Sequence, residues 1–205
     1  MYQTPIVGTV FIILIFLCNL AYAFLARWYA VLHSGVKGER RLFRTVKKLH
    51  GTNIVFHNLP VRYKRGRSEL DMLIVCHAGV LIIEVKNHSG TISGSWRDDK
   101  WTQRKHYRDG KVTETMMDNP IKQMRRQRDI VKSILTAAGE NVWIDSVLYF
   151  SSPNAKLKIS LRESDYVCCE SAELLEFLKS YDSGETLSKS RMEHIAQILR
   201  ESSGV

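Results

Sequence analysis

The stretch that decides the fold is residues 69–87, ELDMLIVCHAGVLIIEVKN. It contains two runs of β-forming residues, 69–77 and 80–87, and the tight Ala78-Gly79 turn between them predicts an antiparallel hairpin. The second run is apolar on both faces, which is typical of a strand in the middle of a covered sheet. Charged residues inside such a strand therefore indicate a functional site.

Two charged side chains, Glu84 and Lys86, lie in this second strand, and their spacing of two places them on the same face of the sheet. Asp71, in the preceding strand, can approach Glu84 across the hairpin. The carboxylates of Asp71 and Glu84 suit Mg²⁺ or Mn²⁺, and Lys86 would hold or help deprotonate an attacking water. A purely structural ion pair between Lys86 and either carboxylate stays open, although buried pairs stabilise a fold poorly.

A helix is predicted upstream, over residues 36–50, with Glu39 at the centre of its apolar face. The cations of this segment all lie outside that face; they include Arg40, Arg41, Arg44, Lys47 and Lys48. A lone carboxylate in an apolar face is costly unless it is paired, so we expect Glu39 to meet a metal, a lysine or a proton. The alternative is a wetted glutamate near the helix start, beside Gly38, that interacts with the helix dipole.

A second helix is predicted to begin after Asp118 or Asn119, with Pro120 in its first turn. Gln123 lies in or beside the apolar stripe of this helix, and an amide that faces a core needs hydrogen-bond partners. We expect Gln123 to serve a metal-bound water or a substrate phosphate. For Gln127, one turn further on, a structural role with backbone partners is equally open.

The charge distribution indicates an anionic partner. The 205 residues contain 30 Lys and Arg against 21 Asp and Glu, a formal net charge of +9, and the excess lies in residues 37–132. The side chains predicted to contact nucleic acid are Trp101, Arg104, Lys105, Lys122, Arg125 and Arg126. The alternative is that the aromatic side chains cover a hairpin face and the cations are simply solvated.

Residues 5–26, PIVGTVFIILIFLCNLAYAFLA, form an apolar run without a charged side chain. As a helix this run would span about 33 Å, against a hydrocarbon core of roughly 30 Å, which predicts a transmembrane anchor. The alternative is a signal peptide cleaved at Ala21-Tyr22-Ala23. Basic residues follow the run and none precedes it, so we expect a single-pass protein of the cell (inner) membrane with its C-terminal domain in the cytoplasm.

Other classes of protein are excluded by the motifs that the sequence lacks. The four cysteines include no C-x-x-C pair, which excludes a zinc ribbon and a disulfide framework. The seven histidines include no H-E-x-x-H, and there is no G-x-S-x-G or phosphate-binding loop. Proteases, kinases and serine hydrolases therefore have no support.

Several short motifs follow one another in a fixed order over roughly residues 35–150. They are Gly35-x-x-Gly38-Glu39, Glu69-Leu70-Asp71, Gly79-Val80 followed by Ile83-Glu84-Val85-Lys86-Asn87, Gly90-x-Ile92, Trp101, and Asn119-Pro120-x-x-Gln123. No single motif is specific, but the combination closely resembles the nuclease-related domain, NERD. That domain in turn is similar to the PD-(D/E)xK nuclease superfamily.

The resemblance implies an α/β fold of the restriction-endonuclease-like type, with a mixed central sheet flanked by helices. It also implies hydrolysis of phosphodiester bonds in DNA or RNA, with DNA favoured, and dependence on Mg²⁺ (or Mn²⁺). The catalytic residues implied by the resemblance are Glu39, Asp71, Glu84, Lys86 and Gln123. Of these, Asp71, Glu84 and Glu39 would hold the metal.

The sequence therefore predicts three parts: an anchor at 1–28, a NERD-like core at 29–150, and a C-terminal extension at 151–205 packed on the core. The core is expected to end in a strand at 143–150, and the extension to contain helices at 171–180 and 188–201. The expected function is that of a membrane-anchored, metal-dependent nuclease, which also contacts the bilayer through residues 5–26. The alternative is a catalytically silent, membrane-tethered module of the same fold that binds nucleic acid or protein.

Overall fold

The computed structural model describes residues 4–46 and 53–203. The chain divides into two compact units, Met1–Lys37 and Gly38–Val205. The first unit is helical, and the second contains every strand described below. The helix α1 (Thr4–Val46) supplies the first unit and also the beginning of the second.

The transmembrane anchor predicted at residues 5–26 is corrected by the structure. Within residues 4–46 and 53–203, no helix combines the length and the apolar character that crossing a bilayer requires. The prediction rested on the length of the apolar run and on its lack of charge; in the structure this run is part of α1, which continues through the basic segment as far as Val46. This finding also overturns the single-pass location in the inner membrane. Residues 47–50 of the helix predicted at 36–50 lie outside the described residues.

Five strands form the first sheet, in the order β1-β2-β3-β7-β9. They are β1 (Ile54–Tyr63), β2 (Gly66–Cys76), β3 (Gly79–Lys86), β7 (Ile144–Phe150) and β9 (Tyr166–Cys168). The first three are antiparallel, whereas β7 and β9 run parallel to β3. The predicted hairpin is thus confirmed, with Cys76 paired to Gly79 at its turn.

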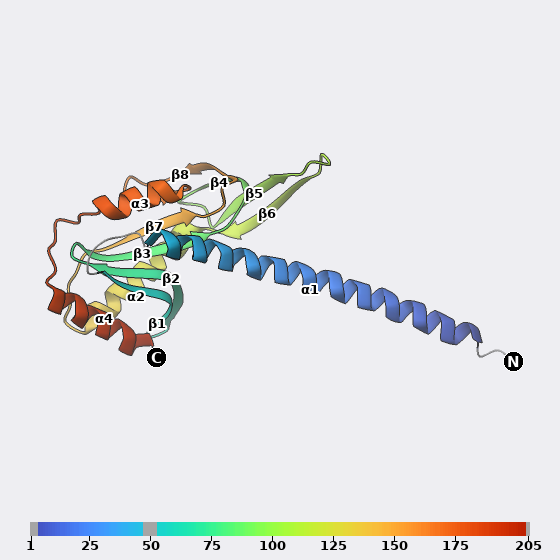
Figure 1. The fold of residues 1–205 in the computed structure, drawn as a ribbon, viewed down its shortest axis with the longest axis horizontal. Helices are drawn as coiled ribbons and strands as arrows, with labels where there is room; N and C mark the ends of the chain where they lie inside the picture. Colours follow the sequence, from blue (N-terminus) through green and yellow to red (C-terminus); the bar gives the residue numbers. More distant parts are fainter. Residues whose placement is uncertain (1–3, 47–52, 204–205) are drawn as a thin grey trace. The chain divides into compact units, whose positions relative to one another are not determined.

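Four further strands form a second sheet, in the order β6-β5-β4-β8 (Figure 1). They are β4 (Gly90–Ser95), β5 (Lys100–His106), β6 (Val112–Asp118) and β8 (Ala155–Ser160). The predicted fold class, with one mixed central sheet, is therefore wrong: the protein is a mixed α/β fold with two sheets. Turn residues predict the local hairpins, but the parallel pairing of β4 with β8 joins segments about 60 residues apart, and nothing local predicts it.

Helices cover both faces of the first sheet. The helices α2 (Pro120–Ala137) and α4 (Lys189–Ser203) pack on one face, where Val80 and Ile82 of β3 point. The end of α1 and the helix α3 (Ser171–Ser180) pack on the other, where Leu81 and Ile83 point. This alternation confirms that β3 is a strand with two buried faces.

The second sheet has a core of its own. Its buried side chains Ile92 and Trp101 pack with Ile121 and Met124 of α2 and with Phe150 of β7. The helix α2 therefore contacts both sheets: its first two turns enter the core of the second sheet with Ile121 and Met124, and its later turns enter the core of the first sheet. This position between the sheets is what brings α2 to the charged residues at the end of β3.

Candidate functional site

The candidate site lies where the pairing of β2 with β3 stops. The ladder ends at Met72 and Ile83, and the next positions in the same register are Asp71 and Glu84. The backbone N–H of Val85 donates instead to Oδ2 of Asp71, at 2.7 Å. Two carboxylates from neighbouring strands are thereby brought together on the face of the sheet that α2 covers.

Glu84 is the most buried acid of this group, with only 1% of its surface exposed. Its Oε1 accepts a hydrogen bond from Lys86 Nζ at 2.5 Å, and its Oε2 accepts one from Gln127 Nε2 at 2.7 Å. A buried charge needs such partners, because removing a carboxylate from water costs several kcal/mol. The spacing of two between Glu84 and Lys86 therefore does place both side chains together.

The carboxyl group of Asp71 has a strongly raised pKa. Burial, and then the neighbouring charge of Glu84, raise its pKa from 3.8 to about 7. The hydrogen bond from Val85 and the charge of Lys86 act in the opposite direction but do not cancel the rise. A carboxyl group whose pKa is raised by burial and by a neighbouring acid is a common feature of functional sites.

Lys86 connects the acids to α2. Its Nζ donates to Gln123 Oε1 at 3.0 Å as well as to Glu84, and 21% of its side chain is exposed. An ammonium group carries three donors, so one remains for a molecule that arrives from solvent. The predicted association of Gln123 with the site is present in the structure as this contact.

The sequence left the role of Gln127 open, and the structure places it in the site. Asn119 caps α2 by accepting a hydrogen bond from the backbone N–H of Ile121, which fixes the start of the helix. From that start, Gln123 and Gln127 lie one turn apart on the same face, and each binds one member of the Glu84–Lys86 pair. The signal for Gln127 was this spacing of four. The Oε1 of Gln127 is buried and has no hydrogen-bond partner within the described residues.

Glu39 is not brought into the same group. It lies on the part of α1 that packs on the opposite face of the sheet, and its Oε2 lies 3.4 Å from Asn58 Nδ2 and 3.8 Å from His57 Nε2. Its charge still contributes slightly to the raised pKa of Asp71. Gly38, just before it, permits the close approach of α1, because a Cβ there would stand 2.5 Å from Ser151 Oγ.

Two carboxylates, those of Asp71 and Glu84, are the candidate ligands for a divalent cation. Among the described residues there is no group of three His, Cys, Asp or Glu side chains placed to hold a metal ion. Asp71 and Glu84 alone remain, and Mg²⁺ is commonly bound by one or two carboxylates together with water. The raised pKa of Asp71 agrees with this, because a cation beside the pair would compensate the charge that burial and Glu84 oppose.

The side chains predicted to contact nucleic acid divide into two groups. Trp101 is fully buried and its indole N–H donates to Ser95 O at 2.9 Å, so it has no free face on which a base could stack. Salt bridges engage three of the cations, in the pairs Arg104–Glu114, Lys122–Asp99 and Arg125–Asp165. Lys105 and Arg126 form none within the part of the chain that the structure describes. Arg126, Lys122 and Gln123 line a hollow of about 240 Å³ beside the site.

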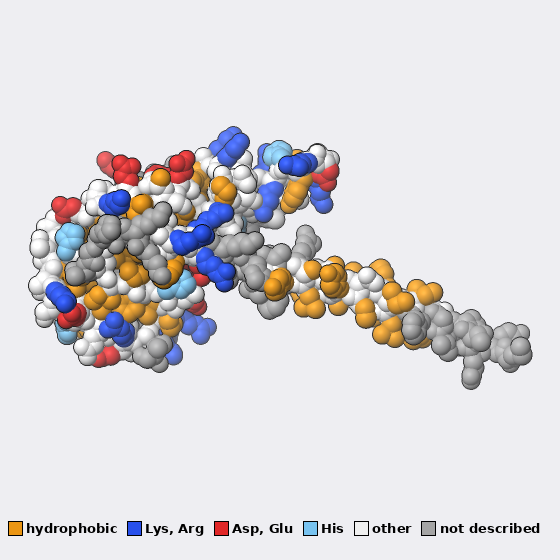
Figure 2. Space-filling view, in the orientation of Figure 1, with side chains coloured by type: hydrophobic (Ala, Val, Ile, Leu, Met, Phe, Trp, Pro, Cys, Tyr) orange, Lys and Arg blue, Asp and Glu red, His pale blue; other side chains and the backbone are white. Residues whose placement is uncertain are grey.

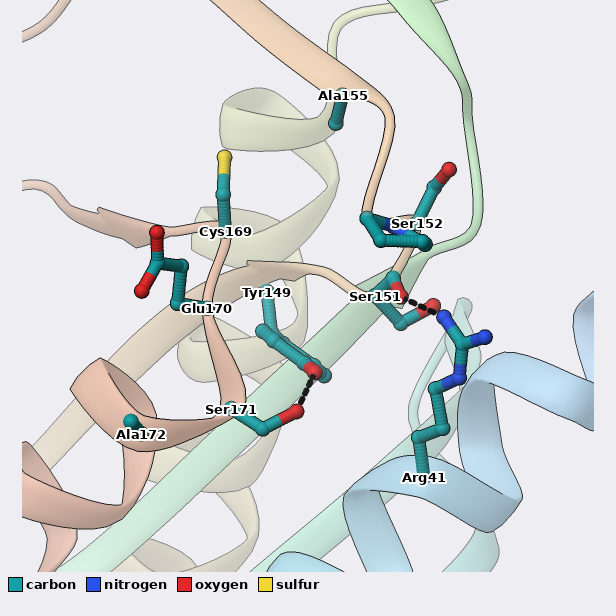
Figure 3. A pocket seen from close by; sticks show the side chains of 10 residues that line it. Arg41, Tyr149, Ser151, Ser152, Ala155, Cys169, Glu170, Ser171 and Ala172 are labelled. Carbon is teal, nitrogen blue, oxygen red and sulfur yellow. Dashed lines mark hydrogen bonds between the residues drawn. The ribbon is translucent and has the colours of Figure 1, made fainter.

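A second hollow, of about 490 Å³, lies at the start of α3 (Figure 3). Arg41 donates to the backbone oxygen of Ser151 at its rim, and the hydroxyl groups of Tyr149 and Ser171 lie 2.7 Å apart. Cys169 is the nucleophile candidate here. Burial and the nearby acid Glu173 raise the pKa of its thiol, so the reactive thiolate is disfavoured at neutral pH. This hollow therefore offers no nucleophilic cysteine.

Comparison with known proteins gives one family. A family model described as the nuclease-related domain matches residues 34–151, which is more than half of the chain. An uncharacterized protein of Bacillus anthracis is 34% identical over 71 residues, which are 34% of this chain and 34% of that protein. The chain thus spans about a third of the length of this relative. No solved structure matches the chain.

Proposed function

Because the chain belongs to the nuclease-related domain family, we propose that it is a divalent-metal-dependent nuclease that hydrolyses phosphodiester bonds, in DNA more than in RNA. The family suggests a nuclease-like function and contact with nucleic acid. The observation that carries the finer proposal is the gathering of Asp71, Glu84 and Lys86 at the end of the β2–β3 ladder, where the pKa of Asp71 is raised to about 7.

Asp71 and Glu84 are the residues that would hold Mg²⁺ or Mn²⁺. The bound ion would lower the pKa of a coordinated water and stabilise negative charge on a phosphoryl oxygen. Its affinity should rise with pH through about 7, because Asp71 must lose its proton before it can act as a ligand. The charge of Glu39 raises the pKa of Asp71, so Glu39 would make Asp71 hold its proton more strongly and would not be a direct ligand of the metal.

Lys86 supplies the positive charge of this chain in the reaction. Two of its three donors are used by Glu84 and Gln123, which fix the ammonium group in one position. The third donor is available to hold a water in the attacking position or to stabilise the anionic transition state. Gln123 and Gln127 act through these two side chains and are positioning residues.

The test is an assay of the full chain on single- and double-stranded DNA and RNA, with Mg²⁺ or Mn²⁺. We expect metal-dependent cleavage, and we expect Glu84→Gln to lower its rate by at least about a hundredfold, because the substitution removes a ligand charge from the site. The matched control is Glu163→Gln, the same change at an exposed acid that makes no salt bridge within the described residues.

Equal residual cutting by the wild type and by Glu84→Gln would show that the cleavage comes from a contaminant, and the proposed function would fail. Cleavage that persists in EDTA would contradict the metal dependence. A loss of the same size in Glu163→Gln would show that the assay reports net charge and not the site.

A catalytically silent module that binds nucleic acid is the second candidate. The observation that favours it is that both oxygens of Glu84 already have protein partners, Lys86 and Gln127, so the network is complete around this acid without a metal. It predicts binding of nucleic acid that is unchanged by EDTA, with no cleavage under any metal. These two results together would contradict the proposed nuclease function and support the binding module.

A further inference from the structure

The two strands β5 and β6 extend beyond the rest of their sheet (Figure 1). The neighbouring strand β4 pairs with β5 only at Thr102–Arg104, whereas β6 pairs with β5 along its whole length. Residues 105–113 are therefore a two-stranded ribbon with no third strand beside it, closed by the Asp109-Gly110 turn. We call these residues the arm. An isolated ribbon of two strands is only marginally stable in water, so its projection needs a reason.

Apolar side chains stand on the arm and beside it without cover. Half of the surface of Tyr107 and half of that of Val112 is exposed, and Met116, next along β6, is 67% exposed. The other large apolar side chains that are exposed among the described residues of the second unit are Phe43, Val55 and Trp143. In the register of the hairpin Val112 and Met116 lie on one face and Tyr107 on the other, so both faces of the projecting ribbon expose apolar side chains, which indicates a ribbon that is enclosed by a partner.

The arm is also positively charged. Lys105, Arg108 and Lys111 lie on it, and none of them forms a salt bridge within residues 53–203. The one acid of the arm, Asp109, uses its carboxylate to accept the backbone N–H of Lys111 and so closes the turn. The hairpin shows Lys and Arg side chains next to apolar ones (Figure 2). Its partner should therefore carry negative charges that meet the cations of the arm, and apolar groups that meet its exposed apolar side chains.

The root of the arm adjoins the candidate site. Gln103, buried at the root, donates to Ser89 O at 2.7 Å, and its Oε1 lies 3.3 Å from His88 Nδ1 and 3.3 Å from Thr115 Oγ1. His88 follows Lys86 by two residues. Burial lowers the pKa of His88, and the charges of Lys86 and Lys105 lower it further, which places a cation of the arm and the site lysine near one imidazole.

We propose that the arm enters the major groove of double-stranded DNA and holds it beside the candidate site. The inference rests on the proposed function and names its substrate class. The major groove of B-form DNA admits a two-stranded ribbon and exposes thymine methyl groups, which suit Tyr107 on the face that it shares with Lys105 and Lys111. The three cations are then placed for the phosphates on either side. The major groove of an RNA duplex is too narrow for the ribbon. Proteins that bind single strands stack the bases on several aromatic side chains, whereas Tyr107 is the one Phe, Tyr or Trp residue of the arm.

The test measures binding by the full chain in EDTA, where no metal-dependent cleavage interferes. The probes are labelled duplex DNA, single-stranded DNA and duplex RNA of one sequence, followed by fluorescence anisotropy over a range of salt. We expect duplex DNA to bind about tenfold more tightly than the other two. Arg108→Gln combined with Lys111→Gln should weaken duplex binding by about tenfold and lower the salt slope by about 2, because two phosphate contacts are lost.

The matched control is Lys156→Gln combined with Lys158→Gln, which removes the same charge from β8 at the other edge of the sheet. It should leave duplex binding within about twofold of the wild type, and thermal unfolding of both double variants checks their folding. Tyr107→Ala should weaken duplex binding without changing the salt slope, because it removes an apolar contact and not a charge.

Three results would overturn the inference: equal binding by the arm variant and the wild type, equal losses in the arm and β8 variants, or a preference for single-stranded DNA or duplex RNA. Metal-dependent cleavage without arm-dependent binding would remove the arm from the mechanism and leave the nuclease standing. Arm-dependent binding of duplex DNA without cleavage would support the arm and overturn the nuclease alone.

Discussion

At the scale of single residues, the candidate site is defined by the way in which each acid is compensated. Glu84 is fully buried and its charge is met by Lys86 and by the amide of Gln127. Asp71 has a single backbone donor, Val85 N–H, and burial together with Glu84 raises its pKa to about 7. The raised pKa of Asp71 is what would let this carboxyl group respond to a cation near neutral pH.

The first prediction concerns Asp71→Asn in the absence of metal. Below about pH 4 the carboxyl is protonated in both the folded and the unfolded chain, so the substitution should change stability little. Between about pH 4 and 7 the unfolded chain loses this proton first, and the wild type loses stability as the pH rises. At pH 8 the asparagine variant should be more stable by on the order of 2 kcal/mol, measured by urea unfolding in EDTA.

The control for this prediction is Asp129→Asn, at an exposed position on α2, which should leave the pH dependence unchanged. A stability difference between wild type and Asp71→Asn that does not vary from pH 4 to pH 8 would contradict the raised pKa. Saturating Mg²⁺ should narrow the difference at pH 8, because a ligand that binds only the folded wild type stabilises it.

Residue placement was predictable where it depends on the strand alone. The period of two in a strand put Glu84 and Lys86 on one face, and the hairpin register put Asp71 opposite Glu84. The position of Glu39 was not predictable, because a helical wheel gives its apolar face but not the face of the sheet on which the helix packs. Trp101 likewise sits among cations in the sequence, and only the tertiary packing shows that it is buried.

At the scale of elements, the second sheet depends on close packing of its strands over α2 and β7. Gly94 of β4 lies against the indole of Trp101, which is fully buried in that core. Any side chain at position 94 would overlap this ring. A ring that large cannot move without displacing Ile92 and Ile121 beside it.

The second prediction is that Gly94→Ala destabilises the protein by about 1–3 kcal/mol, because the added methyl group overpacks a filled core. Chemical unfolding followed by tryptophan fluorescence measures the loss and reports the displaced ring. Gly66→Ala is the matched control, since its methyl group would stand 3.3 Å from the flexible Ile130 side chain and meets less resistance. Equal losses at the two positions would contradict the packing described.

Elements were predictable as far as their signals are local. The expected helix at 171–180 coincides with α3, and the expected start after Asn119 coincides with that of α2, because caps, turns and periodicity act over a few residues. The existence of two sheets was not predictable, since β8 finds its partner β4 far back in the chain. The anchor was wrong because no helix among the described residues combines the length and the apolar character that crossing a bilayer requires.

At the scale of the whole molecule, an element late in the chain completes the core built from early ones. Met192, Ile195 and Leu199 of α4 are fully or almost fully buried against Leu59 and Val61 of β1, in the same core as α2. The C-terminal extension predicted at 151–205 therefore contributes directly to the stability of the sheet that carries the candidate site. The site and α4 lie in one compact unit, so we expect them to unfold together.

The third prediction is that Ile195→Ala costs about 2–5 kcal/mol of stability, as expected for a cavity in a filled core. Hydrogen exchange should speed up for β1 amides as well as for α4, since both elements border the same core. Glu193→Ala, at an exposed position on α4, should change stability by no more than about 0.5 kcal/mol. Faster exchange confined to α4 would show that this helix unfolds on its own.

The late position of α4 has a consequence for synthesis. About 130 residues separate β1 from α4, so at roughly 5–20 residues per second the ribosome delivers α4 on the order of ten seconds after β1. During that interval the face of the sheet around Leu59 and Val61 lacks its final cover in the nascent chain. This uncovered apolar face is where a chaperone would bind the nascent chain. Mutations that weaken the packing of α4 would therefore lower the yield of folded protein at a smaller loss of stability than would be needed to change its activity.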